Sequence, residues 1–281
     1  HDGLQGSSAY SRSVLWAPSP FADPGSRELP VAMEIEDIDA LVAGFAAAAR
    51  AAVAAGLDGV EIDAGPTALP RQFQSGLTNE RNDEYGRDRL LLTRRVLDAV
   101  RAELGPDRVL GLRLSGDELA PWAGITPEQA IEQVTALAGF LDLLVVTRGG
   151  PYSGSAYRPD AHTPPAFNRE LSAALRAAAG GRCRVALQGS VVDVADAEAA
   201  LADGTADLVE MTRALIADAD LVVKARTGRA VRPCVLCNQT CRVRDHRNPI
   251  VSCIVDPRSG YETVDADPLE PQHLGVDVGQ D

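Results

Sequence analysis

The sequence is short of basic residues and of long apolar runs. Its 281 residues contain 27 Lys and Arg against 40 Asp and Glu, a formal net charge of −13. Nucleic acids and anionic membrane surfaces are bound by clustered Lys and Arg side chains, so this composition disfavours both partners. Solubility is the simpler explanation of the acidity. Because no apolar run approaches the ~20 residues of a membrane span, we also expect no insertion into a bilayer.

The chain also lacks the signals of a secreted protein. Residues His1 to Gln5 do not form the basic start of a signal peptide. Only five cysteines are present, and four of them fall between Cys234 and Cys253. A secreted disulfide scaffold distributes its cysteines through a short chain, whereas one late cluster in a Cys-poor chain is typical of a metal site in a reducing compartment. We therefore expect a cytoplasmic protein, with Cys183 as a buried core residue.

Two kinds of segment alternate from Glu36 onward. Ala- and Leu-rich stretches with apolar residues at i, i+3, i+4 and i+7 predict helices, and the short Val-, Ile- and Leu-rich runs between them predict strands. One helix has a clear start, with Thr126 as N-cap, Pro127 in the first position and Gln129 completing a capping box. The expected strands are residues 59–63, 109–115, 143–147, 184–188 and 207–211, and the other expected helices are residues 37–55, 87–104, 168–179, 194–202 and 216–226.

Strict alternation of strands and helices predicts a parallel sheet, in a barrel or in an open doubly wound sheet. The strands are almost continuously apolar, as expected when both faces of the sheet are covered. No G-x-G-x-x-G follows any strand, so the main signal of a dinucleotide-binding open sheet is missing. In a barrel, functional residues follow the C-terminal ends of the strands. Those positions hold Asp63, Arg113–Ser115, Thr147–Arg148, Gly189–Ser190 and Thr212–Arg213.

The four clustered cysteines have the spacing Cys234-x2-Cys237-x3-Cys241-x11-Cys253. Thiolates bind zinc or an iron–sulfur cluster. Structural zinc usually takes two separated C-x2-C-type pairs, so three adjacent cysteines and one single cysteine favour the cluster. Zinc stays open as the alternative, and disulfide pairing would require an oxidising compartment.

The stretch from Cys234 to Cys241, followed by Cys253–Arg258, resembles the iron–sulfur segment of bacterial 2,4-dienoyl-CoA reductase and trimethylamine dehydrogenase, members of the old yellow enzyme superfamily. The cysteine spacing, the Asn-Gln pair and the Pro-Arg after the last cysteine all agree. Thr78–Gly86 resembles the family's Asn-x-Arg-x-Asp-x-Tyr/Trp-Gly loop. Asp207–Lys224 resembles its last strand and its Arg-containing turn for the FMN phosphate. The resemblance covers nearly the whole chain.

This resemblance implies a (β/α)₈ TIM barrel with FMN at its mouth and a [4Fe–4S] cluster on Cys234, Cys237, Cys241 and Cys253. Arg113 would approach the pyrimidine end of the flavin, where a cation suits the anionic reduced form. The alternative for Arg113 is a salt bridge at a strand end. Gly189, Ser190, Thr212 and Arg213 would hold the phosphate; the alternative for Arg213 is a surface position at a helix start.

The resemblance also implies a division of the chain. His1-Asp2-Gly3 resembles the family's His-x-Gly after the third barrel strand, so residues 1–230 are expected to be barrel strands four to eight. Residues 231–263 would be the iron–sulfur segment, and residues 264–281 a linker toward an absent domain that binds FAD and NAD(P)H. Five strands cannot close a barrel, so we expect two unpaired edges. In the family, NAD(P)H reduces FAD, the cluster relays single electrons and FMN delivers hydride to an activated alkene.

The substrate side departs from the family. Ala68 stands where relatives have a proton-donating Tyr, and Asp63 and Pro66 stand where paired His residues hold a carbonyl. Ala cannot donate a proton, and Asp is anionic unless its pKa is raised. Tyr152 aligns with a second family acid after the sixth strand and is the candidate proton donor, with His162 in the same loop and a plain surface Tyr as the alternatives.

The expected activity is therefore that of an FMN- and [4Fe–4S]-dependent oxidoreductase that reduces an activated double bond in a small molecule. Asp63 suggests an alternative, because a carboxylate near the flavin suits a cationic substrate, as in amine oxidation. A third interpretation is an electron-transfer module that has lost catalysis.

Overall fold

The computed structural model describes residues 14–242 and 251–261, so His1-Asp2-Gly3 and the expected linker at 264–281 lie outside the described residues. The chain divides into two compact units, residues 1–211 and residues 212–281. None of the described helices is both long and apolar enough to cross a bilayer.

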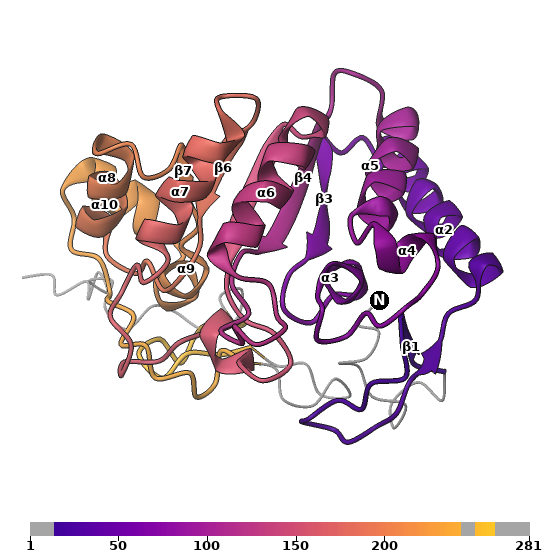
Figure 1. Cartoon of the computed structure of the whole chain (residues 1–281). Coiled ribbons are helices and arrows are strands. Elements are labelled where there is room, and N and C mark those ends of the chain that lie inside the picture. The colour runs from indigo at the N-terminus through magenta and orange to yellow at the C-terminus, as the bar shows by residue number, and fades with distance from the viewer. Residues whose placement is uncertain (1–13, 243–250, 262–281) are drawn as a thin grey trace, which may run out of the picture. The chain divides into compact units, whose positions relative to one another are not determined.

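The first unit contains an all-parallel sheet of five strands (Figure 1). Its order is the chain order, β3-β4-β5-β6-β7, so each strand pairs with its neighbours in sequence. Within the described residues β3 and β7 each have one hydrogen-bonded neighbour. The predicted α/β fold with a parallel sheet is confirmed. The strands are β3 (Gly59–Ala64), β4 (Val109–Ser115), β5 (Leu143–Thr147), β6 (Arg184–Leu187) and β7 (Leu208–Val209).

Alternation along β4 explains how the sheet separates core from function. Leu110, Leu112 and Leu114 are fully buried and belong to the main apolar core, which also includes buried residues of the helices. Because successive side chains point to opposite faces of a strand, Arg113 lies on the other face. Its register partners are Asp63 on β3 and Val145 on β5. The sheet therefore turns one face to the core and keeps a polar group on the other.

The predicted helices of the first unit are confirmed as α2 (Ile35–Ala54), α5 (Leu91–Leu104), α6 (Pro127–Leu137), α7 (Arg169–Ala179) and α8 (Val194–Ala202). The helices α2 and α5 pack against each other, as do α6 and α7. The capping box of α6 forms as predicted, with the Thr126 side chain accepting from the Gln129 N–H and the Gln129 side chain accepting from the Thr126 N–H.

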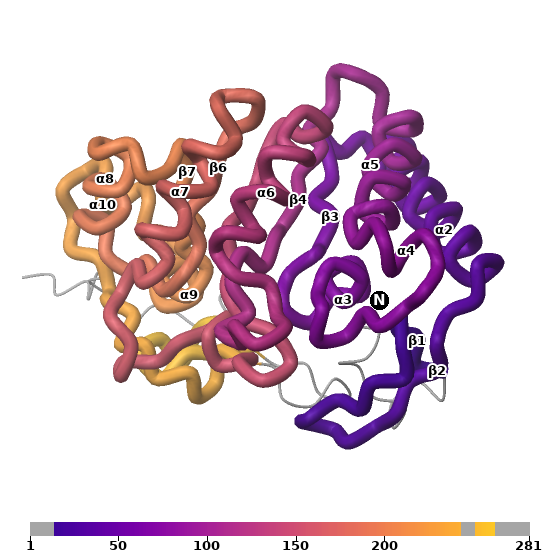
Figure 2. Tube along the Cα trace, viewed as in Figure 1, coloured from indigo at the N-terminus to yellow at the C-terminus, as the bar shows by residue number. Residues whose placement is uncertain are grey.

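Several short elements were not predicted. They are the helices α3 (Leu69–Gln74) and α4 (Glu84–Arg87), the 3₁₀ turns η2 (Ala138–Phe140) and η3 (Gly154–Tyr157), and the strands β1 (Trp16–Ala17) and β2 (Val31–Ala32). The start predicted for the second helix, residue 87, is wrong: residues 84–87 form α4, and α5 begins at Leu91. The trace in Figure 2 shows β1 and β2 side by side, and they pair in parallel.

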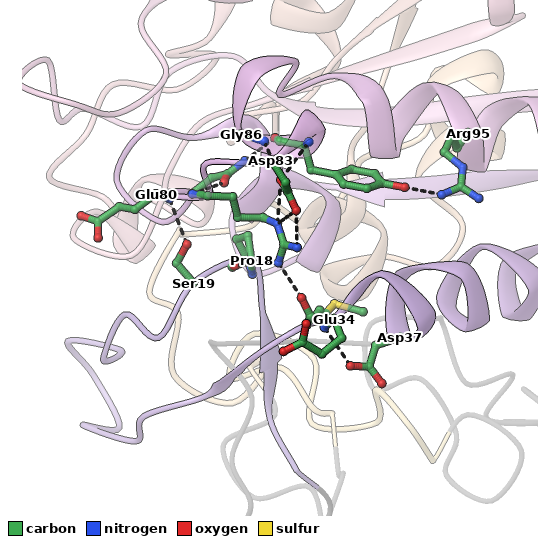
Figure 3. Close-up of polar contacts among 12 residues, drawn as sticks. Pro18, Ser19, Glu34, Asp37, Glu80, Asp83, Gly86 and Arg95 are labelled. Carbon is green, nitrogen blue, oxygen red and sulfur yellow. Dashed lines mark hydrogen bonds and ion pairs between the residues drawn. The ribbon is translucent and has the colours of Figure 1, made fainter.

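Arg81 ties the Asn-x-Arg-x-Asp-x-Tyr-Gly loop to the β1–β2 segment (Figure 3). Its guanidinium donates to the carbonyl oxygens of Pro18 at 3.1 Å and Met33 at 2.5 Å. It also donates to both carboxylate oxygens of Asp83, which in turn accepts from the N–H groups of Tyr85 and Gly86 at the start of α4. The loop is thus held by charge-assisted hydrogen bonds.

In the second unit the helix predicted over residues 216–226 is wrong, because two helices take its place. They are α9 (Thr212–Ala217) and α10 (Leu221–Thr227). Asp218 separates them: its buried carboxylate accepts from the Asp220 N–H, from Lys224 Nζ and from the Arg232 N–H. A carboxylate committed to these three donors favours a bend over a continued helix.

Candidate functional site

The first candidate site surrounds Arg113, on the polar face of the sheet. Its Nε donates to Glu61 Oε1 at 2.7 Å. Its two terminal nitrogens donate to the two oxygens of Glu210, at 3.0 and 3.1 Å. Burial alone would lower the pKa of Arg113, but the hydrogen bonds and charges of Glu210, together with the charge of Glu61, outweigh it and raise the pKa. The guanidinium is therefore a fixed cation held by two carboxylates.

Asp63 and Tyr157 belong to the same group of charges. Asp63 is exposed, lies opposite Arg113 in the strand register, and accepts from the Gly65 N–H at 2.7 Å. Tyr157 ends η3, in the loop after β5, and is half-buried. Burial raises the pKa of Tyr157, the charges of Asp63 and Glu210 raise it further, and Arg113 opposes them. The phenol is therefore a neutral O–H donor at neutral pH. Tyr157, Glu61 and Glu210 were not predicted from the sequence.

Tyr152 stands in a different setting. Its side chain is 55% exposed, and its ring makes edge contacts with Phe21 at 6.3 Å and Trp122 at 6.0 Å between centroids. His162 is a surface residue whose ring nitrogen lies 3.0 Å from Asp160. Its side chain is 94% exposed. The catalytic role of Tyr152 stays a prediction, and the loop offers Tyr157 as a second tyrosine.

Ala68 and Pro66 are both buried. Ala68 is the N-cap of α3, with an extended backbone. Neither residue can exchange a proton. A proton donor at this end of the sheet must therefore come from another segment.

The turn after β6 holds both Gly189 and Ser190 in backbone conformations with positive φ. Gly189 has φ 134°, and a Cβ added there would lie 2.7 Å from Asn168 Nδ2. The same Asn168 nitrogen donates to the Gln188 carbonyl at 2.7 Å. Ser190 has φ 58°, and its hydroxyl donates to the Pro159 carbonyl at 3.3 Å. Thr212 belongs to the second unit. Phosphate binding by these residues stays a prediction.

The second candidate site is the cysteine cluster, which lies within the second unit. Cys234, Cys237, Cys241 and Cys253 line one pocket. All four are free thiols. Leu236 and Asn238 have positive φ values of 54° and 51°, which bend the chain tightly between the cysteines. The spacing therefore brings four thiols to one pocket, and their binding of a cluster stays a prediction.

The choice between zinc and a cluster stays a prediction from the cysteine spacing. Tetrahedral zinc with Zn–S bonds of ~2.3 Å requires its sulfur atoms within ~4 Å of one another. In the described part of the chain, no group of three or more His, Cys, Asp or Glu side chains is placed to hold a single metal ion. Burial raises the pKa of the Cys234 thiol, whereas the Leu236 N–H and Arg213 lower it.

Arg213 also lines this pocket. Its Nη1 donates to Asn238 Oδ1 at 2.6 Å. Asn238 lies between Cys237 and Cys241, so this contact attaches the cation of α9 to the cysteine loop. A positive charge here offsets the negative charge of a site with four thiolates.

Comparison with known proteins gives a consistent result. Residues 13–232 match the NADH:flavin oxidoreductase / NADH oxidase family. The chain is 35% identical over 266 residues to a metal reductase of Desulforamulus reducens, a match that covers 92% of this chain and 39% of the relative. It is 33% identical over 264 residues to a probable N-methylproline demethylase of Rhizobium meliloti, covering 88% of this chain and 37% of the relative.

Among solved structures, 2-naphthoyl-CoA reductase in complex with 2-naphthoyl-CoA is similar with a TM-score of 0.86 at 27% identity, covering 93% of this chain and 42% of that one. The chain thus spans about two fifths of the length of these relatives. The predicted resemblance to the old yellow enzyme superfamily and its TIM-barrel fold class is confirmed, although the five described strands do not by themselves form a closed barrel.

Proposed function

The chain belongs to the NADH:flavin oxidoreductase / NADH oxidase family, and from this premise we propose that it is the FMN- and [4Fe–4S]-binding part of an enzyme that reduces an activated double bond with electrons from NAD(P)H. The observation that carries this proposal is the convergence of four cysteines on one pocket, in a chain whose residues 13–232 match a flavin-dependent family. Residues 264–281 would lead toward an FAD- and NAD(P)H-binding domain.

Arg113 supports the flavin part of the proposal. Ion pairs with Glu61 and Glu210 fix the direction of its guanidinium. A fixed cation at the end of the strands suits the anionic pyrimidine end of a reduced flavin. Gly189, Ser190, Thr212 and Arg213 would hold the phosphate through backbone N–H groups and one guanidinium.

The thiols support the cluster part. Cys234, Cys237, Cys241 and Cys253 would each supply one thiolate, the usual ligand set of a [4Fe–4S] cluster. When bound, the flavin would supply hydride chemistry and the cluster single-electron transfer.

The chain's own residues would handle the proton. Reduction of a double bond adds a hydride at one carbon and a proton at the other, so a donor must reach the second carbon. Tyr157 is neutral and half-buried beside Arg113 and Asp63. Tyr152 is the other tyrosine of this loop. Either phenol would donate its proton and recover it from solvent.

A second candidate function is amine oxidation, favoured by the carboxylates. Glu61, Asp63 and Glu210 lie around a single Arg113, so the described group carries an excess of negative charge. A protonated amine would be attracted there. Oxidation would move a hydride from the carbon next to nitrogen to the flavin and one proton to a base, and it would leave an imine that water hydrolyses to a carbonyl compound and a shorter amine.

Cofactor content of the full-length protein tests the proposal first. Purified without oxygen, it should show flavin absorption, about four irons and matching sulfide in the cysteine segment. One zinc and no flavin would contradict it and leave a zinc-stapled barrel.

Asp63→Asn then separates the two activities. Wild-type turnover of an amine that Asp63→Asn abolishes would support amine oxidation. Wild-type turnover of an alkene that Asp63→Asn leaves unchanged, with no turnover of amines, would support double-bond reduction. If the reduced protein is reoxidised by no alkene and the oxidised protein is reduced by no amine, the chain is an electron-transfer module.

A further inference from the structure

We propose that the buried ion pair between Arg232 and Asp256 is a positioning clamp that brings Cys253 to the other three cysteines and so completes the ligand set. This inference rests on the proposed function, because the site it completes is the cluster site. It concerns residues outside the cysteine motif itself.

The clamp joins the two ends of the cysteine excursion, by which we mean the segment from Arg232 to Asp256 that carries all four cysteines. Arg232 precedes Cys234 by two residues, and Asp256 follows Cys253 by three. Arg232 Nη1 donates to Asp256 Oδ2 at 2.7 Å, and the two side chains are only 6% and 3% exposed. The excursion that carries all four cysteines is therefore closed at its base by one desolvated ion pair.

A second buried pair anchors the clamp to the helices. The Arg232 N–H donates to Asp218 Oδ2 at 2.8 Å, and Lys224 Nζ donates to the two oxygens of Asp218 at 2.9 and 3.0 Å. Burial opposes the charged form of Asp218, but the Arg232 N–H and Lys224 outweigh it and lower its pKa. Arg232 also donates to the Ala217 carbonyl at 3.2 Å. Two cations and two anions thus compensate one another in the interior.

A further contact joins the residues that precede Cys241 and Cys253. The Thr240 hydroxyl donates to the Ser252 carbonyl at 2.9 Å, and the Ser252 N–H donates to the Thr240 carbonyl at 3.2 Å. Thr240 directly precedes Cys241, and Ser252 directly precedes Cys253. These two hydrogen bonds hold the residue before the third cysteine against the residue before the fourth.

The energetics favour a geometric role for the ion pair. Replacing a buried ion pair by apolar residues is often neutral or stabilising, so such a pair is a poor means of gaining stability. The Arg232–Asp256 pair has a directed geometry that an apolar contact lacks. It fixes where the returning chain passes, which is what a four-thiolate site requires of its fourth ligand.

The test compares Asp256→Asn with Cys253→Ser in the full-length protein. The Asn substitution keeps the size of the side chain and removes the charge that holds Arg232. We expect both variants to fall from about four irons per chain toward about three and to share one altered electron paramagnetic resonance spectrum. Asp256→Glu, which restores the charge, should recover part of the wild-type spectrum. Glu103→Gln, which breaks the exposed Arg50–Glu103 pair, is the matched control and should leave iron content unchanged.

Retention of about four irons and the wild-type spectrum by Asp256→Asn would overturn the clamp. If Asp256→Asn does not fold, Arg232→Lys is measured in its place against the same prediction. This substitution keeps the positive charge but loses the planar guanidinium that directs the hydrogen bond to Asp256. Wild-type protein without iron and sulfide would refute the proposed function alone. The clamp is then decided on metal-free protein, where mild oxidation should link Cys253 to the trio several-fold less in Asp256→Asn than in wild type; equal yields would overturn it.

Discussion

Arg113 and Glu210 are 97 residues apart in sequence and form a two-pronged ion pair, with both terminal nitrogens of the guanidinium on both oxygens of the carboxylate. This geometry fixes the plane and direction of the guanidinium. Glu61 holds the remaining Nε. The cation that the proposed flavin site would offer is thus an Arg already shared between two carboxylates. We expect substitution of the Arg and of its carboxylate partners to shift a flavin potential in opposite directions.

Arg113→Gln should weaken FMN binding and make the flavin harder to reduce, because it removes the cation near the developing negative charge. A charge-assisted hydrogen bond contributes ~1.5–3 kcal/mol, so FMN affinity should fall by about tenfold to a hundredfold. Glu210→Gln should shift the flavin potential the other way, since it leaves Arg113 less neutralised. Flavin titration and potentiometry of the full-length variants measure both effects, and shifts of the same sign would contradict this account.

Much of this fold follows from local sequence, and the misses have physical causes. The apolar runs and the Thr126 cap are local signals, and they predicted the five strands of the sheet and α6, although β7 covers only Leu208–Val209 of the expected residues 207–211. The helix α3 has six residues including Pro70, too few to show a helical period. The break at Asp218 depends on Arg232, which is distant in sequence and was not visible as a partner.

Of the two candidate sites, one could be predicted from the sequence and the other could not. The cysteine site could be predicted because spacing along the chain determines which thiols can meet. The carboxylates around Arg113 could not, because Glu210 is 97 residues away in sequence and directly follows β7, which is not a neighbour of β4 in the sheet. The sequence also could not distinguish Tyr152 from Tyr157, since η3 decides which phenol is half-buried and which is exposed.

The two tyrosines of the loop after β5 should differ in effect. If Tyr157 donates the proton, Tyr157→Phe should lower the turnover of an activated alkene by about 10²-fold or more, the usual contribution of a general acid. Tyr152→Phe keeps the ring contacts with Phe21 and Trp122 and is the matched control. Steady-state turnover with flavin reduction measured separately checks this. A large loss in Tyr152→Phe alone would return the role to Tyr152.

The pH dependence follows from the raised pKa of Tyr157. A group with a raised pKa keeps its proton to higher pH, so the donor form persists through neutral pH. Alkene turnover should be flat there and fall only above the ordinary tyrosine pKa of 10.0. A decline centred near neutral pH would point to another donor.

Asp83 should make the first unit sensitive to acid. Hydrogen bonds from Arg81 outweigh burial and lower the pKa of Asp83 below its ordinary value of 3.8. Its contribution to stability is therefore complete above that value and is lost as the pH falls through the lower folded value. Asp83→Asn should reduce the urea midpoint at neutral pH and flatten its decline toward about pH 3. The exposed carboxylate of Asp98 offers the control, and Asp98→Asn should leave both unchanged.

The fully buried pair Arg71–Glu118 should be the most costly ion pair of the first unit to break. Both side chains are 0% exposed, and Glu118 also accepts from the Ser75 hydroxyl and the Ile125 N–H. Glu118→Gln leaves a buried cation without its counter-charge, so unfolding free energy should fall by ~3–5 kcal/mol. Arg71→Met combined with Glu118→Gln removes both charges and should cost less than Glu118→Gln alone. Urea unfolding followed by fluorescence measures the three proteins, and a double variant less stable than the single one would show that the charge pair is not the cause.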